Sequence, residues 1–215
     1  MTAAAIRACL IFVALFSCAP VARAALITFD DLPVNPIPNG YAGLNWSGLY
    51  LQKAPTSGAD TGIDSSVVSL PGVAVQQFAR QAIHISAPSG TFEFNSAYFA
   101  GVLYDNLFIE VGGYKLGTSL NGAPDYSASF FVNMTAPTLQ IFNWLDVADV
   151  RINACCGSKH FSYFGNEADN FLMDNLRVNA SSEQTSVPEP STIALIAMAL
   201  LSLFGLCMMR RRAEA

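Results

Sequence analysis

The chain is poor in charge, and especially in bases. Only 13% of its 215 residues are charged, and 11 Lys and Arg stand against 16 Asp and Glu. Residues 25–186 hold six bases and fourteen acids, a net charge of −8. Because Lys and Arg hold phosphate groups, this deficit argues against nucleic acid as a partner and against anionic lipid surfaces.

Groups that do chemistry near neutral pH are also scarce. The chain has two histidines, and it lacks G-x-S-x-G, H-E-x-x-H and a phosphate-cradling glycine loop. His84 sits between two isoleucines, as a packed histidine does, and His160 follows Cys155 and Cys156 closely. A Cys–His pair can supply nucleophile and base, but adjacent cysteines oxidise more readily. We expect no enzyme; a glycan-active hydrolase using two of the fourteen acids is the alternative.

Cysteine is almost absent between the two ends of the chain. Cys9, Cys18 and Cys207 lie in the terminal apolar stretches, which leaves only Cys155 and Cys156. No C-x-x-C metal pattern is present. An oxidising compartment permits disulfides, so the pair predicts a vicinal disulfide, a bond to another chain, or two thiols in a surface loop.

The N-terminus has the order of a secretory signal. Arg7 precedes an apolar stretch from Ala8 to Ala19, and Ala22-Arg23-Ala24 follows. A basic start, an apolar core and an A-x-A ending predict a signal peptide over residues 1–24. The rival interpretation is a lipoprotein with acylated Cys18, for which Phe16 is a poor fit.

The C-terminus holds the longest apolar run. Ile193 to Met209 are 17 residues without a charge, and three arginines follow. As a helix this run would span about 26 Å, close to the roughly 30 Å of a bilayer core. Arginines stay on the cytoplasmic side, so we expect a single transmembrane helix over 193–209 with the rest of the chain exported.

This tail resembles the PEP-CTERM sorting signal of bacterial secreted proteins, over residues 187–212. The matching residues are Val187, Pro188, Glu189, Pro190, Arg210, Arg211 and Arg212. The resemblance implies recognition by an exosortase-type membrane enzyme that cuts near the Pro-Glu-Pro and passes the protein to the cell surface. A permanent membrane anchor that is never cut is the alternative.

Residues 25–179 have the pattern of an all-β domain. Short β-branched or aromatic stretches alternate with Gly, Pro, Asn and Asp turns, and no segment holds a helical period. Leu107, Ile109 and Val111 alternate with Phe108 and Glu110. We expect a jelly-roll-like two-sheet sandwich in which the first and last strands are neighbours, followed by a polar linker over residues 180–186. The predicted strands are Leu26–Phe29, Leu44–Leu51, Ser66–Leu70, Gln81–Ile85, Phe92–Ala100, Leu107–Tyr114, Ala128–Asn133, Leu139–Trp144, Val147–Asn153 and Phe171–Val178.

The domain also looks like the sandwich domains common ahead of PEP-CTERM tails. The residues that carry this likeness are Ile27–Leu32, Val111–Tyr114, Pro137–Leu139 running into Phe142–Trp144, and Met173–Leu176. The resemblance implies a carbohydrate-binding-module-like fold without a settled activity.

Two groups of residues are candidate sites. Residues two apart on a strand share a face, so Asp174 is expected on the face of Leu172, Leu176 and Val178, and Asp31 on that of Ile27 and Phe29. A bare carboxylate there is costly. If the terminal strands are neighbours, the acids could converge on a structural Ca²⁺; the simpler alternative is that they accept backbone N–H bonds. The predicted metal ligands are Asp30, Asp31, Asp174 and Asn175.

The aromatic residues give the second candidate site. Trp46 and Trp144 fit either core packing or a platform for sugar rings, with packing favoured. Tyr163, in a glycine-containing loop, is the better glycan candidate because loops carry function more often. The sequence as a whole predicts an exported, non-enzymatic protein that passes through an inner-membrane intermediate to the cell surface or medium. There we expect a structural or adhesive role in exopolysaccharide or biofilm, with polysaccharide as a partner.

Overall fold

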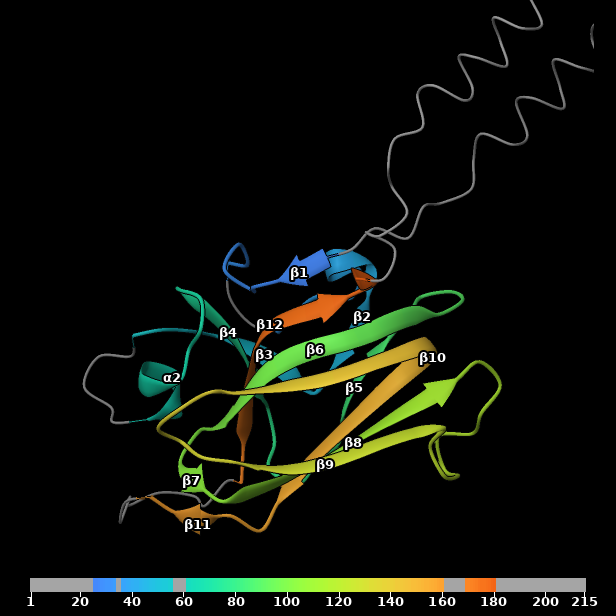
Figure 1. Cartoon of the computed structure of the whole chain (residues 1–215). Coiled ribbons are helices and arrows are strands. Elements are labelled where there is room, and N and C mark those ends of the chain that lie inside the picture. Colours follow the sequence, from blue (N-terminus) through green and yellow to red (C-terminus); the bar gives the residue numbers. More distant parts are fainter. Residues whose placement is uncertain (1–24, 34–35, 56–60, 161–168, 181–215) are drawn as a thin grey trace, which may run out of the picture. The chain divides into compact units, whose positions relative to one another are not determined.

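The folded body is built almost entirely of strands, as the sequence predicts. The computed structural model describes residues 25–33, 36–55, 61–160 and 169–180 (Figure 1). Its elements are β1 (Ala25–Ile27), η2 (Tyr41–Gly43), β2 (Asn45–Ser47), β3 (Leu49–Lys53), α2 (Gly62–Ser65), β4 (Gly72–Gln76), β5 (Ile83–Ser86), β6 (Phe92–Gly101), β7 (Tyr104–Asp105), β8 (Leu107–Lys115), β9 (Tyr126–Val132), β10 (Thr138–Cys155), β11 (Ser158–Lys159) and β12 (Phe171–Val178).

Two antiparallel layers share one long strand. The first half of β10 pairs with β6, and its second half, from Val147 on, pairs with β8 and β5. Sheet I is therefore β3, β4, β1, β12, β6 and early β10, and sheet II is β9, β8, late β10, β5 and β2. The register slips twice where β10 changes layer, at Asn143 (φ 50°) and Asp146 (φ 57°). Such bulges let one strand turn the corner of a sandwich.

Several strand boundaries differ from the prediction. The stretches 139–144 and 147–153 form one strand, because the bulges bend β10 without ending it. Residues 44–51 form two strands, because Gly48 (φ 79°) breaks the extended backbone. The prediction of a strand at Ser66–Leu70 is wrong. The N–H groups of Val68 and Ser69 donate to the carboxylate of Asp174 instead of to a neighbouring strand. The residues that follow form strand β4.

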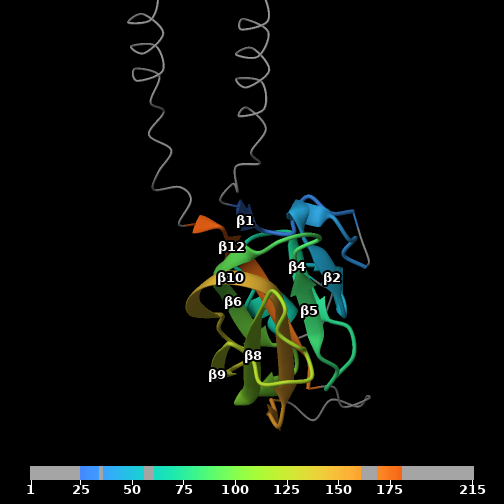
Figure 2. The ribbon, with the colours of Figure 1, turned by 90° about the vertical axis from the view of Figure 1, so that its right-hand side faces the viewer.

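The first and last strands are neighbours, as expected. β1 and β12 pair antiparallel, with Ala25 opposite Val178 and Ile27 opposite Leu176. Both views show β1 beside the end of β12 (Figures 1 and 2). The body therefore begins and ends at the same end of the sandwich, with β7 and β11 at the opposite end (Figure 1).

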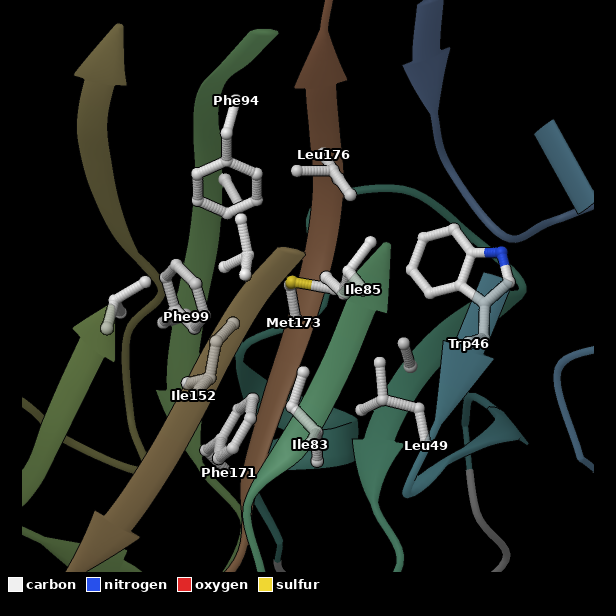
Figure 3. Close-up of a cluster of buried hydrophobic side chains, with 14 of the residues drawn as sticks. Trp46, Leu49, Ile83, Ile85, Phe94, Phe99, Ile152, Phe171, Met173 and Leu176 are labelled. Carbon is white, nitrogen blue, oxygen red and sulfur yellow. The ribbon is translucent and has the colours of Figure 1, made fainter. Parts of the chain in front are cut away.

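A large apolar core fills the space between the sheets. Figure 3 shows Phe94, Phe99 and Met173 of sheet I facing Ile85 and Ile152 of sheet II, and each of the five is fully buried. The predicted alternation on β8 is confirmed, since Leu107, Ile109 and Val111 are buried while Glu110 is exposed. Burial of such apolar side chains is the main stabilising contribution to the fold.

A second, smaller core lies on the outer side of sheet I. It packs Leu172, Val73, Val75 and Ala100 of the sheet against Ala54, Ile63 and Val102. Ile63 belongs to residues 61–70, here called the covering segment. The hydroxyls of Ser65 and Ser66 donate to the carbonyl of Met134 at 2.8 and 2.5 Å. Gly62 fits because a Cβ there would lie 1.9 Å from the Gly101 carbonyl oxygen.

The predicted signal peptide (1–24) and sorting tail (187–212) lie outside the described residues. In the described part of the chain, no helix is long and apolar enough to cross a membrane. Contacts along the chain separate a unit ending at Ser181 from one beginning at Ser182, and the predicted helix over 193–209 belongs to the second.

Candidate functional site

The three acids among the predicted metal ligands accept hydrogen bonds from protein groups. Asp30 accepts the N–H of Gly72 at 2.8 Å, and Asp31 accepts the hydroxyl of Tyr41 at 2.7 Å. Burial, followed by this hydrogen bond, raises the pKa of Tyr41 well above its ordinary value. Asp31 itself is exposed. Hydrogen bonding of this kind is the alternative that the sequence left open for these acids.

Asp174 is the most deeply buried of the four predicted ligands. Its carboxylate accepts the N–H groups of Val68, Ser69 and Asn175 at 2.7–2.9 Å and the Ser69 hydroxyl at 3.2 Å. Burial raises its pKa, and the donated hydrogen bonds only partly offset that effect. The Ser69 hydroxyl also lies 3.0 Å from Oδ1 of Asn175. Asp174 thus fastens the covering segment to sheet I.

The prediction that Asp174 shares a face of β12 with Leu172, Leu176 and Val178 is correct for Leu172 and wrong for the other two. Asp174 points to the covering segment with Leu172, whereas Leu176 and Val178 belong to the central core. Asn175 has φ 49°, and the pairing of β12 with β6 shifts register there. A bulge adds one residue and so reverses the alternation after it. In the described ranges, no three His, Cys, Asp or Glu side chains are grouped closely enough to hold a metal ion.

Both tryptophans lie in the core. Trp46 is 6% exposed, donates its indole N–H to the carbonyl of Tyr41 and packs edge-on against Phe29. Trp144 is 8% exposed and stacks on Tyr126, with ring centroids 5.5 Å apart. Little ring surface remains for a sugar. The third aromatic candidate, Tyr163, lies outside the described residues.

The two remaining cysteines form a vicinal disulfide at the end of β10. Both histidines pair with an aspartate that the sequence did not single out. His84 Nδ1 lies 3.1 Å from Asp149, and His160 Nδ1 contacts Asp105. Partial burial raises the pKa of Asp105, but the hydrogen bonds from His160 and the Met134 N–H outweigh it, so this pKa lies below its ordinary value.

A hollow with a polar lining crosses the outer face of sheet II. It holds about 450 Å³ and lies over β8, β9 and late β10, with Pro124 of the β8–β9 connection at its side. Its polar lining residues include Glu110, Ser127, Ser129, Arg151 and Asn153. We call this hollow the sheet II groove; the neighbouring strands β8 and β9 are visible in both overall views (Figures 1 and 2).

Strand register places the charged groups of the groove. Arg151 lies opposite Gly112, and Asn153 lies opposite Glu110, so Arg151 and Glu110 are diagonal neighbours. Diagonal neighbours on adjacent strands are about 7–8 Å apart. No ion pair joins these two within the described ranges, and Arg151 Nε is buried there without a hydrogen-bond partner. An unpaired buried donor is costly, which makes it an informative feature of the groove.

Charge beside the groove is set by the His84–Asp149 pair. Burial raises the pKa of Asp149, while His84 and the positive charge of Arg151 act in the opposite direction without cancelling it.

The sequence showed that Glu110 points outward, because its neighbours alternate. It could not show that Arg151 and Asn153 would lie beside it, since strand pairing sets that neighbourhood.

The glycine pair in the middle of β8 serves both sides of sheet II. A Cβ on Gly113 would lie 2.7 Å from the Trp144 ring, so glycine makes room for that ring in the core. A Cβ on Gly112 would enter the space beside Pro124 and Tyr114, at 3.2 and 3.4 Å. Gly112 therefore keeps the base of the groove open opposite Arg151.

Comparison with known sequence families identifies the tail. Residues 186–212 match the model of the PEP-CTERM protein-sorting motif. This confirms the resemblance seen in the sequence. The chain is an exported protein handled by an exosortase at the membrane. No curated protein matches the chain.

Three solved structures are distantly similar. The K1 adhesin domain of Lys-gingipain from Porphyromonas gingivalis W83 is 9% identical (TM-score 0.42; 73% of this chain and 98% of that chain covered). A DUF4465 family protein from Bacteroides ovatus is 6% identical (TM-score 0.40; 75% of this chain and 90% of that chain covered). TmCBM61, solved with β-1,4-galactotriose, is 12% identical (TM-score 0.30; 67% of this chain and 97% of that chain covered). At these TM-scores the likenesses carry no argument about function.

Proposed function

We propose that the chain is a non-enzymatic protein of the bacterial surface or extracellular matrix, with an adhesive or structural role in exopolysaccharide or biofilm. The observation that carries this proposal is a PEP-CTERM motif behind a single strand-built body that has an open polar groove. Sorting brings such a body to the cell exterior, where polysaccharide is the material that it meets. Adhesion to polysaccharide is the function that this combination supports best.

The chemistry of the described residues favours binding over catalysis. The cysteines are joined to each other, so they offer no thiolate nucleophile. The acidic body disfavours polyanions, and the groove suits a ligand rich in hydroxyl groups.

The test is retention of the purified full chain by polysaccharide. The chain is run in detergent through gels that each contain one neutral or one acidic polysaccharide. At least one of these polysaccharides should slow the chain, whereas albumin should migrate unchanged. Absence of retardation in every gel would refute adhesion to polysaccharide. Release of new reducing ends from a retained polysaccharide would instead support a hydrolase.

The fate of the tail needs a separate measurement. Mass spectrometry of the protein recovered from the cell surface should show a C-terminus near Pro188–Pro190. Recovery of the protein with Arg210–Arg212 intact would support permanent anchoring.

A further inference from the structure

We propose that the sheet II groove is the polysaccharide-binding site and that it takes an uncharged chain through the ring hydroxyls. This inference rests on the proposed function and assigns it to particular residues. The groove presents one acid, Glu110, one base, Arg151, and the amide of Asn153. A ligand that fills it must satisfy donors and acceptors that lie side by side.

The first step is the unpaired donor. Arg151 Nε is buried without a partner in the described part of the chain, whereas most buried polar groups in proteins are hydrogen-bonded. Arginine donates and cannot accept, so its partner must be an oxygen acceptor. Nε itself has almost no accessible surface, so a ligand meets the rest of the Arg151 side chain, which lines the groove, and must bring an oxygen to the guanidinium group.

The second step is that Glu110 needs a hydrogen-bond donor, whereas Arg151 needs an acceptor. An ionised carboxylate only accepts hydrogen bonds, and Glu110 lies one diagonal step from Arg151. A carboxylate-bearing ligand would satisfy Arg151 but face the charge of Glu110, and a cation would do the reverse. A hydroxyl both donates and accepts, so adjacent sugar hydroxyls satisfy both side chains at once.

The third step is the space available. Gly112 lies opposite Arg151 and leaves the base of the groove without a side chain. Ser127 and Ser129 of β9 are small and exposed, and they leave the hollow open along the sheet. Its 450 Å³ is within the usual size range of ligand pockets. An extended chain can lie across the strands without ending in the groove.

The test combines a filled groove with changed contacts. Ser127→Tyr places a ring in the hollow, and Arg151→Ala removes the donor. In affinity electrophoresis of the full chain with neutral glucan, mannan and galactan, each variant should lose at least about tenfold in affinity for the polysaccharide that retains the wild type. Glu110→Gln should also weaken binding without making alginate a better ligand than the neutral polysaccharide.

The matched controls lie elsewhere on the sandwich. Arg177→Ala removes an exposed arginine from the outer face of sheet I, and Ser89→Tyr adds a ring in the exposed turn between β5 and β6, outside the groove. Both should bind as the wild type does. Thermal unfolding of every variant separates lost binding from lost folding.

Two results would overturn the inference. If the wild type is retained but Ser127→Tyr and Arg151→Ala leave retention unchanged, the site lies elsewhere and the proposed function stands. If alginate binds more tightly than every neutral polysaccharide, the ligand class is wrong. No retention of the wild type by any polysaccharide would remove both the site and the proposed function.

Discussion

The two outer faces of the sandwich are put to different uses. On sheet I, the covering segment buries Leu172, Val73 and Val75 under Ile63. On sheet II, the corresponding outward positions hold Glu110, Arg151 and Asn153 and remain open as a groove. What is left uncovered of sheet I is a hollow of about 430 Å³ with Leu26, Leu139 and Ile141 at its surface.

The difference follows from the side chains that each sheet turns outward. Apolar residues on the outer side of sheet I gain from being covered, and the segment that covers them is fastened by buried Asp174. Charged and amide groups on sheet II would lose hydration under a cover, so the face stays open. The covered part of sheet I therefore contributes to stability, while the groove of sheet II is free to bind a ligand.

The strongest test of this comparison is Leu172→Ala. Leu172 is fully buried under the covering segment, so the cavity left behind should reduce the free energy of unfolding by about 2–5 kcal/mol. Glu110→Ala on the open face should change it by less than about 0.5 kcal/mol. Urea unfolding measures both, and equal effects would contradict the division between the faces.

The next test concerns the carboxylate that holds the cover. Asp174→Asn keeps the shape but turns an amide N–H₂ toward the N–H groups of Val68 and Ser69. We expect a loss of about 2–4 kcal/mol in the free energy of unfolding, because buried donors are left unpaired. Asp146→Asn, the same change at an exposed position with φ 57°, should be close to neutral. Equal stability of the two variants would show that Asp174 is no anchor.

A third test compares the two sides of sheet II through adjacent glycines. Gly113→Ala forces a methyl group against the Trp144 ring and should cost about 1–3 kcal/mol of stability. Gly112→Ala, directed into the groove, should cost less than about 1 kcal/mol but weaken polysaccharide binding. Thermal unfolding and affinity electrophoresis give the two values. If Gly112→Ala proved more destabilising than Gly113→Ala, then Gly112 and not Gly113 would face the core of the sandwich.

The smallest effect concerns Asp105, a partly buried counterpart of Asp174. It accepts the Met134 N–H at 2.9 Å, and its pKa lies below the ordinary 3.8. A lowered folded-state pKa means that the charged form stabilises the fold above about pH 3.8, and that this contribution is lost as pH falls through the lower folded value.

Asp105→Asn should therefore lower the melting temperature by no more than a few degrees at about pH 7. At about pH 2 the difference from the wild type should shrink. A difference that grows on acidification would contradict the direction of the shift.

Local sequence patterns predicted much of the fold and little of the groove. β12 was predicted with its observed bounds, and the alternation on β8 gave the buried and exposed sides. Bulges at Asn143, Asp146 and Asn175 were not predicted, because asparagine and aspartate adopt positive φ only where pairing around them requires it. The face of Asp174 was missed for that reason.

The sequence by itself determined that this protein is exported and carries a PEP-CTERM sorting motif, and it determined the strand-built class. Sorting signals are read as linear motifs and alternation is a local property, so neither needs the fold to be known. Only the tertiary structure decided which polar residues meet. Glu110 and Arg151 are forty-one positions apart and become neighbours because β8 and β10 pair in one register. Register is set by the apolar side facing the core, and the outward side chains follow it.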